Sequence, residues 1–314
     1  MMSRRWILAG GALTLLLALL PLVLSSYHLG LATKMLIFAL FAMSLDLLLG
    51  YAGLASLGHA AFFGIAAYTV GLLSLRLGTN WWLAFPAGLI AGGGVGALFG
   101  LLALRARGSY FLMITLALAQ VLWGIAFGWR TLTGGDDGLP NIPRPDLGLP
   151  WPLTDNTPFY YFVLLIAGAA AVLLGAIVQS PFGYALRGIR ESESRMLALG
   201  YNVWRYKYLA FVLAALFSGL AGCLYVYFNR FVSPEYLHVI RSAEVLIMVI
   251  LGGAGTLIGP AIGAGVIVFL EDMMSSYTQR WLLVLGLVYV VVTLFAPRGL
   301  IGLVHDYRQR RSLS

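Results

Sequence analysis

The sequence predicts an all-α polytopic membrane protein with about eight to ten transmembrane helices, some of them broken or re-entrant. Of its 314 residues, 61% are hydrophobic and only 10% are charged, whereas roughly a quarter of the residues of a soluble domain are charged. The apolar residues form segments close to the length of about 20 residues that crosses a bilayer. Basic residues gather in the short loops between these segments, as the positive-inside rule describes. We therefore expect the whole chain, 1–314, to form one transmembrane domain.

Hydropathy indicates the following apolar segments, in chain order: 6–24, 34–50, 58–75, 81–104, 109–129, 158–179, 206–229, 242–271 and 281–296. The first segment follows two arginines and ends before Ser25 and Ser26, so residues 1–25 resemble a cleaved signal peptide in composition. That segment is also long enough to span the membrane, and we favour a retained first helix.

Two segments carry small residues spaced four apart, which predicts close helix packing: Gly92, Gly96 and Gly100, and Ala214, Ser218 and Gly222.

The charges in the loops predict how the chain is oriented. Placing Arg4 and Arg5 in the cytoplasm puts Arg105 and Arg107 inside after four spans, and a loop at 180–207 inside after six. The loop 130–157 then lies outside, and its charged residues are four acidic and two basic: Asp136, Asp137, Asp146 and Asp155, and Arg130 and Arg144. The asymmetry of basic residues agrees with this orientation at each loop.

The segment 242–271 is predicted to be re-entrant. Two complete crossings after 206–229 would leave the tail 297–314 outside, yet this tail carries four arginines that belong inside: Arg298, Arg308, Arg310 and Arg311. A break at 252–260, which we call the second break, interrupts the segment with Gly252, Gly253 and Gly255 and with Pro260, residues that disfavour a helix interior. A re-entrant segment there leaves both termini in the cytoplasm.

An earlier glycine-rich stretch, 50–58, is predicted to interrupt another helix, and we call it the first break. Aligning Ala52-Gly53 with Ala254-Gly255 brings Gly58 onto Gly259 with one deletion, which predicts an internal repeat. In transporters built from repeats, paired helix interruptions in the two halves mark the transport site. The glycines of both breaks are therefore candidate functional positions: Gly53, Gly58, Gly252, Gly253, Gly255 and Gly259.

No catalytic signature occurs in the chain, which lacks HExxH, GxSxG and Walker phosphate-loop motifs. We therefore predict no enzyme activity and no cofactor. The four histidines are scattered and Cys223 is the single cysteine, so neither a metal site nor a disulfide is expected. The net charge of +8 is explained by the cytoplasmic loops and tails, and it does not indicate nucleic-acid binding.

Six polar residues within or beside the apolar spans are candidates for a translocation path: Asp46, Tyr51, Ser56, His59, Thr115 and Thr256. Asp46 is either a path-lining or proton-linked carboxylate, or a structural residue that is paired or hydrated near the cytoplasmic end of its span; we favour the structural interpretation. Ser56 and His59 could bind a zwitterionic solute, or Ser56 could cap a helix while a neighbour satisfies His59.

The loop 180–207, which we call the coupling loop, has the highest density of charge in the chain. We expect a short amphipathic helix over 186–199, ended by Gly200, that docks on a soluble partner; the alternative is a solvated positive-inside loop. The residues proposed for docking are Arg187, Arg190, Glu191, Glu193, Arg195 and Gly200.

Several sequence motifs in this order resemble the permease subunits of branched-chain amino-acid ABC transporters, in particular their longer M-type permease. The resemblance covers roughly 34–303, and its motifs are GYAGLASLGHAAFFGIAAY (50–68), LRARGSYFLMITLALAQ (104–120), TLTGGDDGLPNIP (131–143), residues 182–225, FVSPE (231–235), VILGGAGTLIGPAIGA (249–264) and FAPRGLIGL (295–303).

The resemblance implies an importer in the bacterial inner membrane, with a sister permease, cytoplasmic ABC ATPase subunits and a periplasmic solute-binding protein. It places the coupling helix that docks on the ATPase at 190–200 and implies transport of branched-chain amino acids by alternating access. The loop matches the family's EAA-type pattern only loosely, and Asp46 stands where an amide is expected. Urea or short-chain amides are the alternative solutes.

A passive channel and an ion-coupled carrier are the rival classes. A passive channel would need no coupling loop. A carrier would use carboxylates such as Asp46, Glu244, Glu271 and Asp272.

Overall fold

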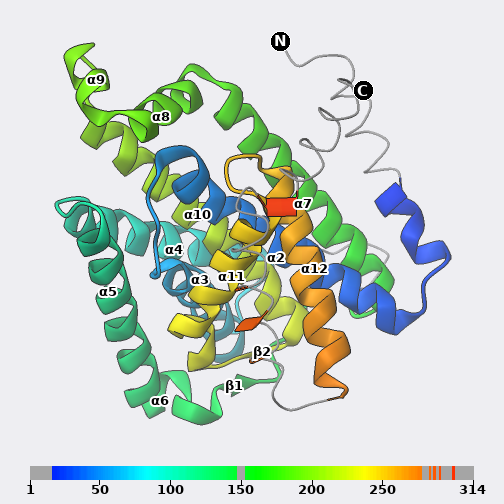
Figure 1. Ribbon diagram of the computed structural model, residues 1–314. Coiled ribbons are helices and arrows are strands. Elements are labelled where there is room, and N and C mark those ends of the chain that lie inside the picture. The colour runs from blue at the N-terminus through cyan, green and yellow to red at the C-terminus, as the bar shows by residue number, and fades with distance from the viewer. Residues whose placement is uncertain are drawn as a thin grey trace, which may run out of the picture.

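A computed structural model describes residues 16–146 and 153–277, together with 283, 286, 287, 290, 299 and 300. Its secondary structure is almost entirely helical, in the chain order η1 Leu20–Leu22, α2 Ser26–Asp46, η2 Leu47–Ala52, α3 His59–Arg76, α4 Trp81–Ala103, α5 Ser109–Gly128, α6 Arg130–Thr133, η3 Gly135–Asp137, β1 Leu139–Pro140, α7 Asn156–Gln179, α8 Pro181–Glu191, α9 Glu193–Ala198, α10 Val203–Asn229, β2 Phe231–Val232, η4 Pro234–Leu237, α11 Val239–Gly252 and α12 Ile258–Ser275 (Figure 1).

Seven of these helical segments are long and apolar enough to cross a membrane: Ser26–Ala52, His59–Arg76, Trp81–Ala103, Ser109–Gly128, Asn156–Gln179, Val203–Asn229 and Ile258–Ser275. The predicted all-α polytopic class is therefore confirmed. Most of the predicted spans 6–24 and 281–296 lies outside the described residues. The second span begins at Ser26 and not at 34 as predicted. The reason is that Lys34 is neutralised by Glu271, 3.0 Å away, and so does not end the span.

The core of the bundle is the packing of α10 against α3 and α4, and small residues make it possible. Gly92 of α4 lies close to Gly219 of α10: a Cβ added at Gly92 would be 3.3 Å from the Cα of Gly219. A Cβ at Gly96 would overlap Ala215, and a Cβ at Gly222 would overlap the backbone of Phe63 on α3. The predicted close packing of these segments is confirmed, because only glycine allows the helix backbones to approach this closely.

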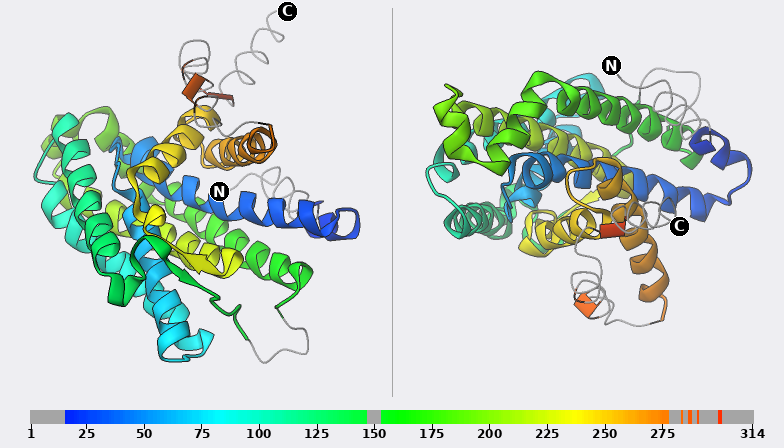
Figure 2. Two further views of the ribbon diagram at one scale, coloured as in Figure 1. Left: turned by 90° about the horizontal axis from the view of Figure 1, so that it is seen from below. Right: turned by 45° about the horizontal axis from the view of Figure 1, so that its top comes forward.

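The two ends of the bundle carry different structures. Helices α8 and α9 lie at one end, and α6 with the two short strands lies at the other (Figure 1). The strands pair antiparallel, with Leu139 opposite Val232 and Pro140 opposite Phe231, which ties the 130–157 loop to the connection between α10 and α11. Helix α5 stays at the edge of the bundle in every view (Figure 2).

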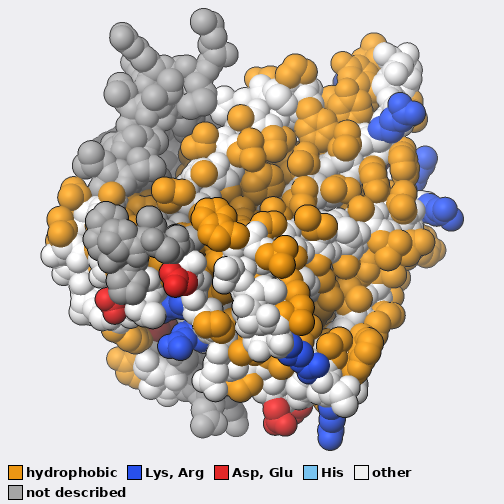
Figure 3. All heavy atoms as spheres, turned by 180° about the vertical axis from the view of Figure 1, so that it is seen from behind, with side chains coloured by type: hydrophobic (Ala, Val, Ile, Leu, Met, Phe, Trp, Pro, Cys, Tyr) orange, Lys and Arg blue, Asp and Glu red, His pale blue; other side chains and the backbone are white. Residues whose placement is uncertain are grey.

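The outer surface of the bundle is mostly apolar. Hydrophobic side chains cover most of the face seen from behind, and Lys and Arg side chains gather along the edge toward α9 (Figure 3). An apolar belt with charges at its margins is the surface that a bilayer requires.

Helices α11 and α12 form a hairpin that turns at the second break. Tyr27, at the start of α2, donates to Asp272 near the end of α12 at 2.8 Å. The break itself lies at the other end of α2, against Asp46. Helix α12 therefore runs antiparallel to α2, and the chain returns toward the side from which α11 came. A hairpin agrees with the predicted return of the chain to its starting side, but α12 is long and apolar enough to cross a membrane, so the re-entrant depth of 242–271 stays a prediction.

Candidate functional site: the coupling loop and the two helix breaks

The coupling loop folds into two short helices. Helix α8 starts with Pro181 in its first turn, a position that does not need a backbone N–H. At Ser192 the backbone becomes extended, and the Ser192 side chain accepts the N–H of Arg195 at 3.3 Å as the cap of α9. The prediction of one helix over 186–199 is therefore corrected, because serine satisfies the start of a new helix better than it continues an old one. Gly200, with φ +86°, ends α9 as predicted.

A small hydrophobic cluster holds the two helices to α10. Its buried members come from all three helices: Ala185 and Ile189, Met196, and Val203. Glu193 also forms an ion pair with Lys207 of α10. Glu193, predicted to contact a partner, is thus engaged within the chain, and α8, α9 and the start of α10 behave as one packed unit.

The outward face of this unit is apolar as well as basic. Leu197 is 54% exposed, Leu199 is 67% exposed and Tyr184 is 62% exposed. Arg195 and Glu191 are exposed beside them. Large apolar side chains grouped with charges at the end of a membrane bundle are typical of a protein-docking surface.

The two inner arginines of α8 contact the first break. The guanidinium of Arg190 donates from Nη1 to the carbonyl oxygen of Gly50, and its aliphatic stem lies against Gly53, where an added Cβ would be 3.1 Å from Cγ. Arg187 lies over the ring of Tyr51 at 4.9 Å. Gly53 has φ +71°, which glycine adopts without strain. The coupling loop therefore touches the helix interruption directly.

The first break in turn contacts the second. Asp46 is fully buried and accepts the N–H of Gly255 at 2.7 Å and that of Leu257 at 3.0 Å. These N–H groups lie just before α12, where the helix dipole favours a negative charge. A Cβ added at Gly50 would overlap both the Asp46 carboxylate and the Gly255 backbone. The structural interpretation of Asp46 explains these contacts, and a role in the path stays a prediction.

The other predicted path residues are also fixed within the chain. His59 receives a hydrogen bond from, or gives one to, Ser44 at 2.8 Å and stacks on Phe41 at 5.5 Å. Its Nδ1 is buried and has no partner among the residues that the structure describes. Ser56 accepts the N–H of Gly58, the residue that precedes α3, at 3.2 Å. Whether any of them meets a solute stays a prediction.

Two threonines stabilise the loops of the breaks. Thr115 of α5 accepts the N–H of Leu57 at 3.3 Å. Thr256 donates to the carbonyl of Gly253 at 2.8 Å and accepts the N–H of Gly259 at 3.0 Å. These bonds satisfy backbone groups that the helix interruptions would otherwise leave unpaired. Within the described residues, no three His, Cys, Asp or Glu side chains come together in a way that could hold a metal ion.

A model of a known protein family matches residues 27–295, and its description is "Branched-chain amino acid transport system / permease component". The chain belongs to this family. It is a permease subunit of an ABC importer.

Individual relatives support the same family assignment. This permease is 31% identical to the high-affinity branched-chain amino acid transport permease LivM of Escherichia coli K12, over 92% of this chain and 73% of the relative. It is 28% identical to LivM of Salmonella typhimurium, over 93% and 74%. A guanosine ABC transporter permease of Bacillus subtilis, NupQ, is 26% identical over 55% and 58%. No solved structure matches the chain significantly.

Sequence reasoning missed several residues that hold the permease together at these sites. Ser242 accepts the N–H of Ala60 at 3.0 Å, which joins the start of α3 to α11. Arg241 pairs with Glu244 at 2.8 Å. A serine in an apolar run has no distinctive signal. The charges of α11 were visible in the sequence, but their pairing is set by the tertiary structure.

Proposed function

We propose that this permease forms, with a sister permease, the translocation path of an inner-membrane importer for branched-chain amino acids. In this proposal ATP is hydrolysed on separate cytoplasmic subunits, a periplasmic solute-binding protein delivers the solute, and both termini of the chain are cytoplasmic. The observation that carries the proposal is the hydrogen bond from Arg190 to Gly50, because it joins the coupling loop to the helix interruptions.

The docking surface for the ATPase is the exposed face of α8 and α9. Leu197 and Leu199 enter a groove of the ATPase, and the cluster around Met196 makes α8 move together with α9. Closure of the ATPases on ATP therefore displaces α8 as a body. Movements of packed units of this kind are how alternating access is produced in transporters.

The displacement of α8 then reaches the path. Arg190 and Arg187 carry it to the first break at Gly50 and Tyr51. Asp46 carries it to the second break through Gly255. The two breaks move together, because Asp46, four residues before the first break, accepts the N–H groups of Gly255 and Leu257 in the second break, and Gly50 packs against Gly255.

The printed names of the relatives bear on the solute. The relatives that cover most of this chain are named for branched-chain amino acids, which supports that solute. A relative matched over a shorter region is named for guanosine, so membership of the family does not by itself define the solute. Urea or a short-chain amide remains the alternative.

Co-purification with the ATPase subunit tests the proposed function. The double change Leu197→Glu, Leu199→Glu should abolish the association while the permease still elutes as a folded, monodisperse protein. Leu77→Glu is the matched control, since Leu77 is 69% exposed and follows α3 at the end remote from Asp46. Loss of the ATPase in both variants, or in neither, would contradict docking at α9.

A further inference from the structure

A pocket of about 340 Å³ lies between the end of α5 and the start of α11. Its volume is in the range of about 300–1,000 Å³ that is usual for small-molecule sites. The end of α5, which contributes Trp123 and Phe127 to the lining of the pocket, lies toward the end of the bundle that carries α6 and the strands, away from α8 and α9 (Figure 1). None of the candidate path residues lines it.

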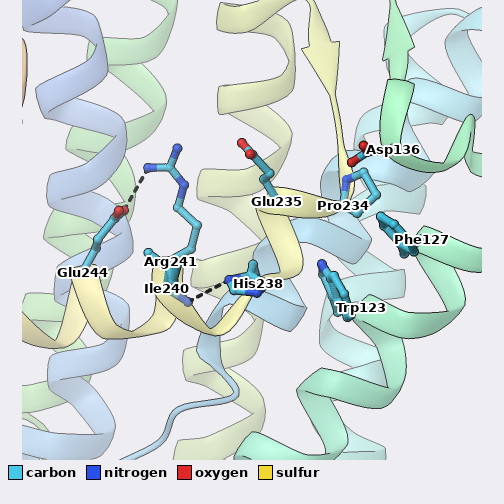
Figure 4. A pocket seen from close by; sticks show the side chains of 9 residues that line it. All are labelled: Trp123, Phe127, Asp136, Pro234, Glu235, His238, Ile240, Arg241 and Glu244. Atoms are coloured by element: carbon cyan, nitrogen blue, oxygen red, sulfur yellow. Dashed lines mark hydrogen bonds and ion pairs between the residues drawn. The ribbon is translucent and has the colours of Figure 1, made fainter. Parts of the chain in front are cut away.

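One wall of the pocket is aromatic. Trp123 and Phe127 of α5 stack with their ring centroids 5.2 Å apart, and the ring of His238 meets Trp123 edge-on at 5.4 Å. His238 is held in place because its Nδ1 accepts the N–H of Ile240 at 3.3 Å. Figure 4 shows these rings facing the charged residues across the pocket. A preformed aromatic wall binds an apolar group with little loss of entropy.

The opposite side of the pocket is charged. Arg241 bonds to Glu244 at 2.8 Å, and Glu244 is only 6% exposed. The guanidinium also lies 6.0 Å from the ring of Phe38, and Lys34, paired with Glu271, approaches the same ring at 5.9 Å. Buried charges are costly unless they are paired, and here each cation has a carboxylate partner.

The charged side can still bind a ligand. A guanidinium has five N–H donors, and among the described residues Arg241 uses one of its terminal nitrogens, on Glu244. Glu235 projects toward the same space as Arg241, and Asp136 lies beyond it near Pro234 (Figure 4). Both carboxylates are exposed. The pocket therefore presents a cation and nearby anions opposite an apolar wall.

We propose that this pocket binds a small zwitterion with an apolar side chain: the carboxylate on Arg241, the ammonium group among Glu235 and Asp136, and the side chain against Trp123 and Phe127. The inference rests on the proposed function, in which the solute is an amino acid and the coupling loop is cytoplasmic. The pocket then opens on the side of the solute-binding protein, and it is the first site on this chain that a released solute occupies.

Binding of radiolabelled L-leucine tests the proposal. The complex of the permeases with the ATPases is placed in lipid nanodiscs without the solute-binding protein. Saturable binding is expected, and Trp123→Ala should weaken it by about tenfold or more, as loss of a central aromatic contact does. Glu235→Gln, on an exposed side chain, should weaken it several-fold. Trp129→Ala is the matched control, because Trp129 is exposed near the end of α5 but does not line the pocket.

Two analogues test the zwitterion requirement. Isoamylamine lacks the carboxylate and 4-methylpentanoate lacks the ammonium group, and each should compete at least tenfold less well than leucine. Equal competition by either would overturn the assignment of the charges.

The outcomes separate this proposal from the proposed function. Absence of saturable leucine binding to a complex that retains its ATPases would overturn the pocket and leave the importer intact. Equal affinity of Trp123→Ala and Trp129→Ala would also overturn it. Loss of receptor docking in Trp123→Ala, with unchanged leucine affinity, would identify the pocket as a receptor contact instead. If the ATPases fail to associate, the proposed function fails, whereas leucine binding to the permease pair still decides the pocket.

Discussion

The carboxylate of Asp46 accepts a hydrogen bond of 2.7 Å from the backbone N–H of Gly255, which lies 209 residues further along the chain. The same carboxylate binds the N–H of Leu257. Leu257 has φ +58°, a backbone conformation that residues other than glycine rarely adopt. The Asp46 side chain thus holds a strained loop at the start of α12, and the two helix interruptions form one connected structure.

Substitution of Asp46 should destabilise the permease by an amount that depends on how many hydrogen-bond acceptors the new side chain keeps. Asp46→Ala removes both acceptors and leaves the buried N–H of Leu257 and the partly buried N–H of Gly255 unpaired, which should cost about 2–4 kcal/mol. Asp46→Asn retains one acceptor and should cost about half as much. Thermal unfolding in detergent measures both.

The same Asp46→Asn variant separates an ABC importer from an ion-coupled carrier. Because both carboxylate oxygens are occupied by N–H groups, uptake should be reduced at every pH while its pH profile keeps its shape. Uptake that loses its pH dependence while ATPase coupling persists would favour the carrier.

Removing the Arg190 side chain should uncouple the transporter. Arg190→Gln loses the contact with the Gly50 carbonyl, so the ATPase should still co-purify while ATP-driven uptake falls by about tenfold, within the usual range of coupling energies. The exposed Arg107→Gln, in the loop between α4 and α5, should leave uptake within about twofold, as surface changes usually do. If Arg190→Gln loses the ATPase itself, Arg190 is a docking residue and not a link to the path.

A methyl group at Gly50 should disturb the contact between the breaks. Gly50→Ala places a Cβ on the Asp46 carboxylate and on the Gly255 backbone, and overpacking of this kind costs about 1–3 kcal/mol or more. Gly30→Ala, on the same helix and with no atom within 4 Å of its added Cβ, should be neutral or stabilising. The comparison of their melting temperatures is the measurement.

A charge exchange tests how α9 is positioned. Lys207→Glu should weaken ATPase binding, because it removes the partner of Glu193 and sets two like charges together. Lys207→Glu combined with Glu193→Lys should restore binding. The stability change should stay below about 1 kcal/mol, since Glu193 is partly exposed. A double variant that binds no better than Lys207→Glu would show that the pair does not position α9.

The helix interruptions and the coupling loop could be predicted because their signals are local. Glycine-rich stretches predict interruptions of helices, and Gly53 and Gly255 do adopt positive φ there; the arginines of the tail predicted that the chain turns back within 242–271. The pairing of Asp46 with Gly255 could not be predicted, since nothing local identifies a partner 209 residues away. The bend at Ser192 was missed because serine occurs both within helices and at their starts, and the sequence alone does not show which of the two positions it takes.

The bend at Ser192 bears on which segments could be exchanged between related permeases. The residue before Ser192 belongs to helix α8, which is fixed on the first break, and the residues after it form a helix with exposed outer side chains. Residues 193–200 should therefore be transplantable between permeases as a cassette. A chimera that carries this cassette from a relative should accept the foreign ATPase and still import its original solute.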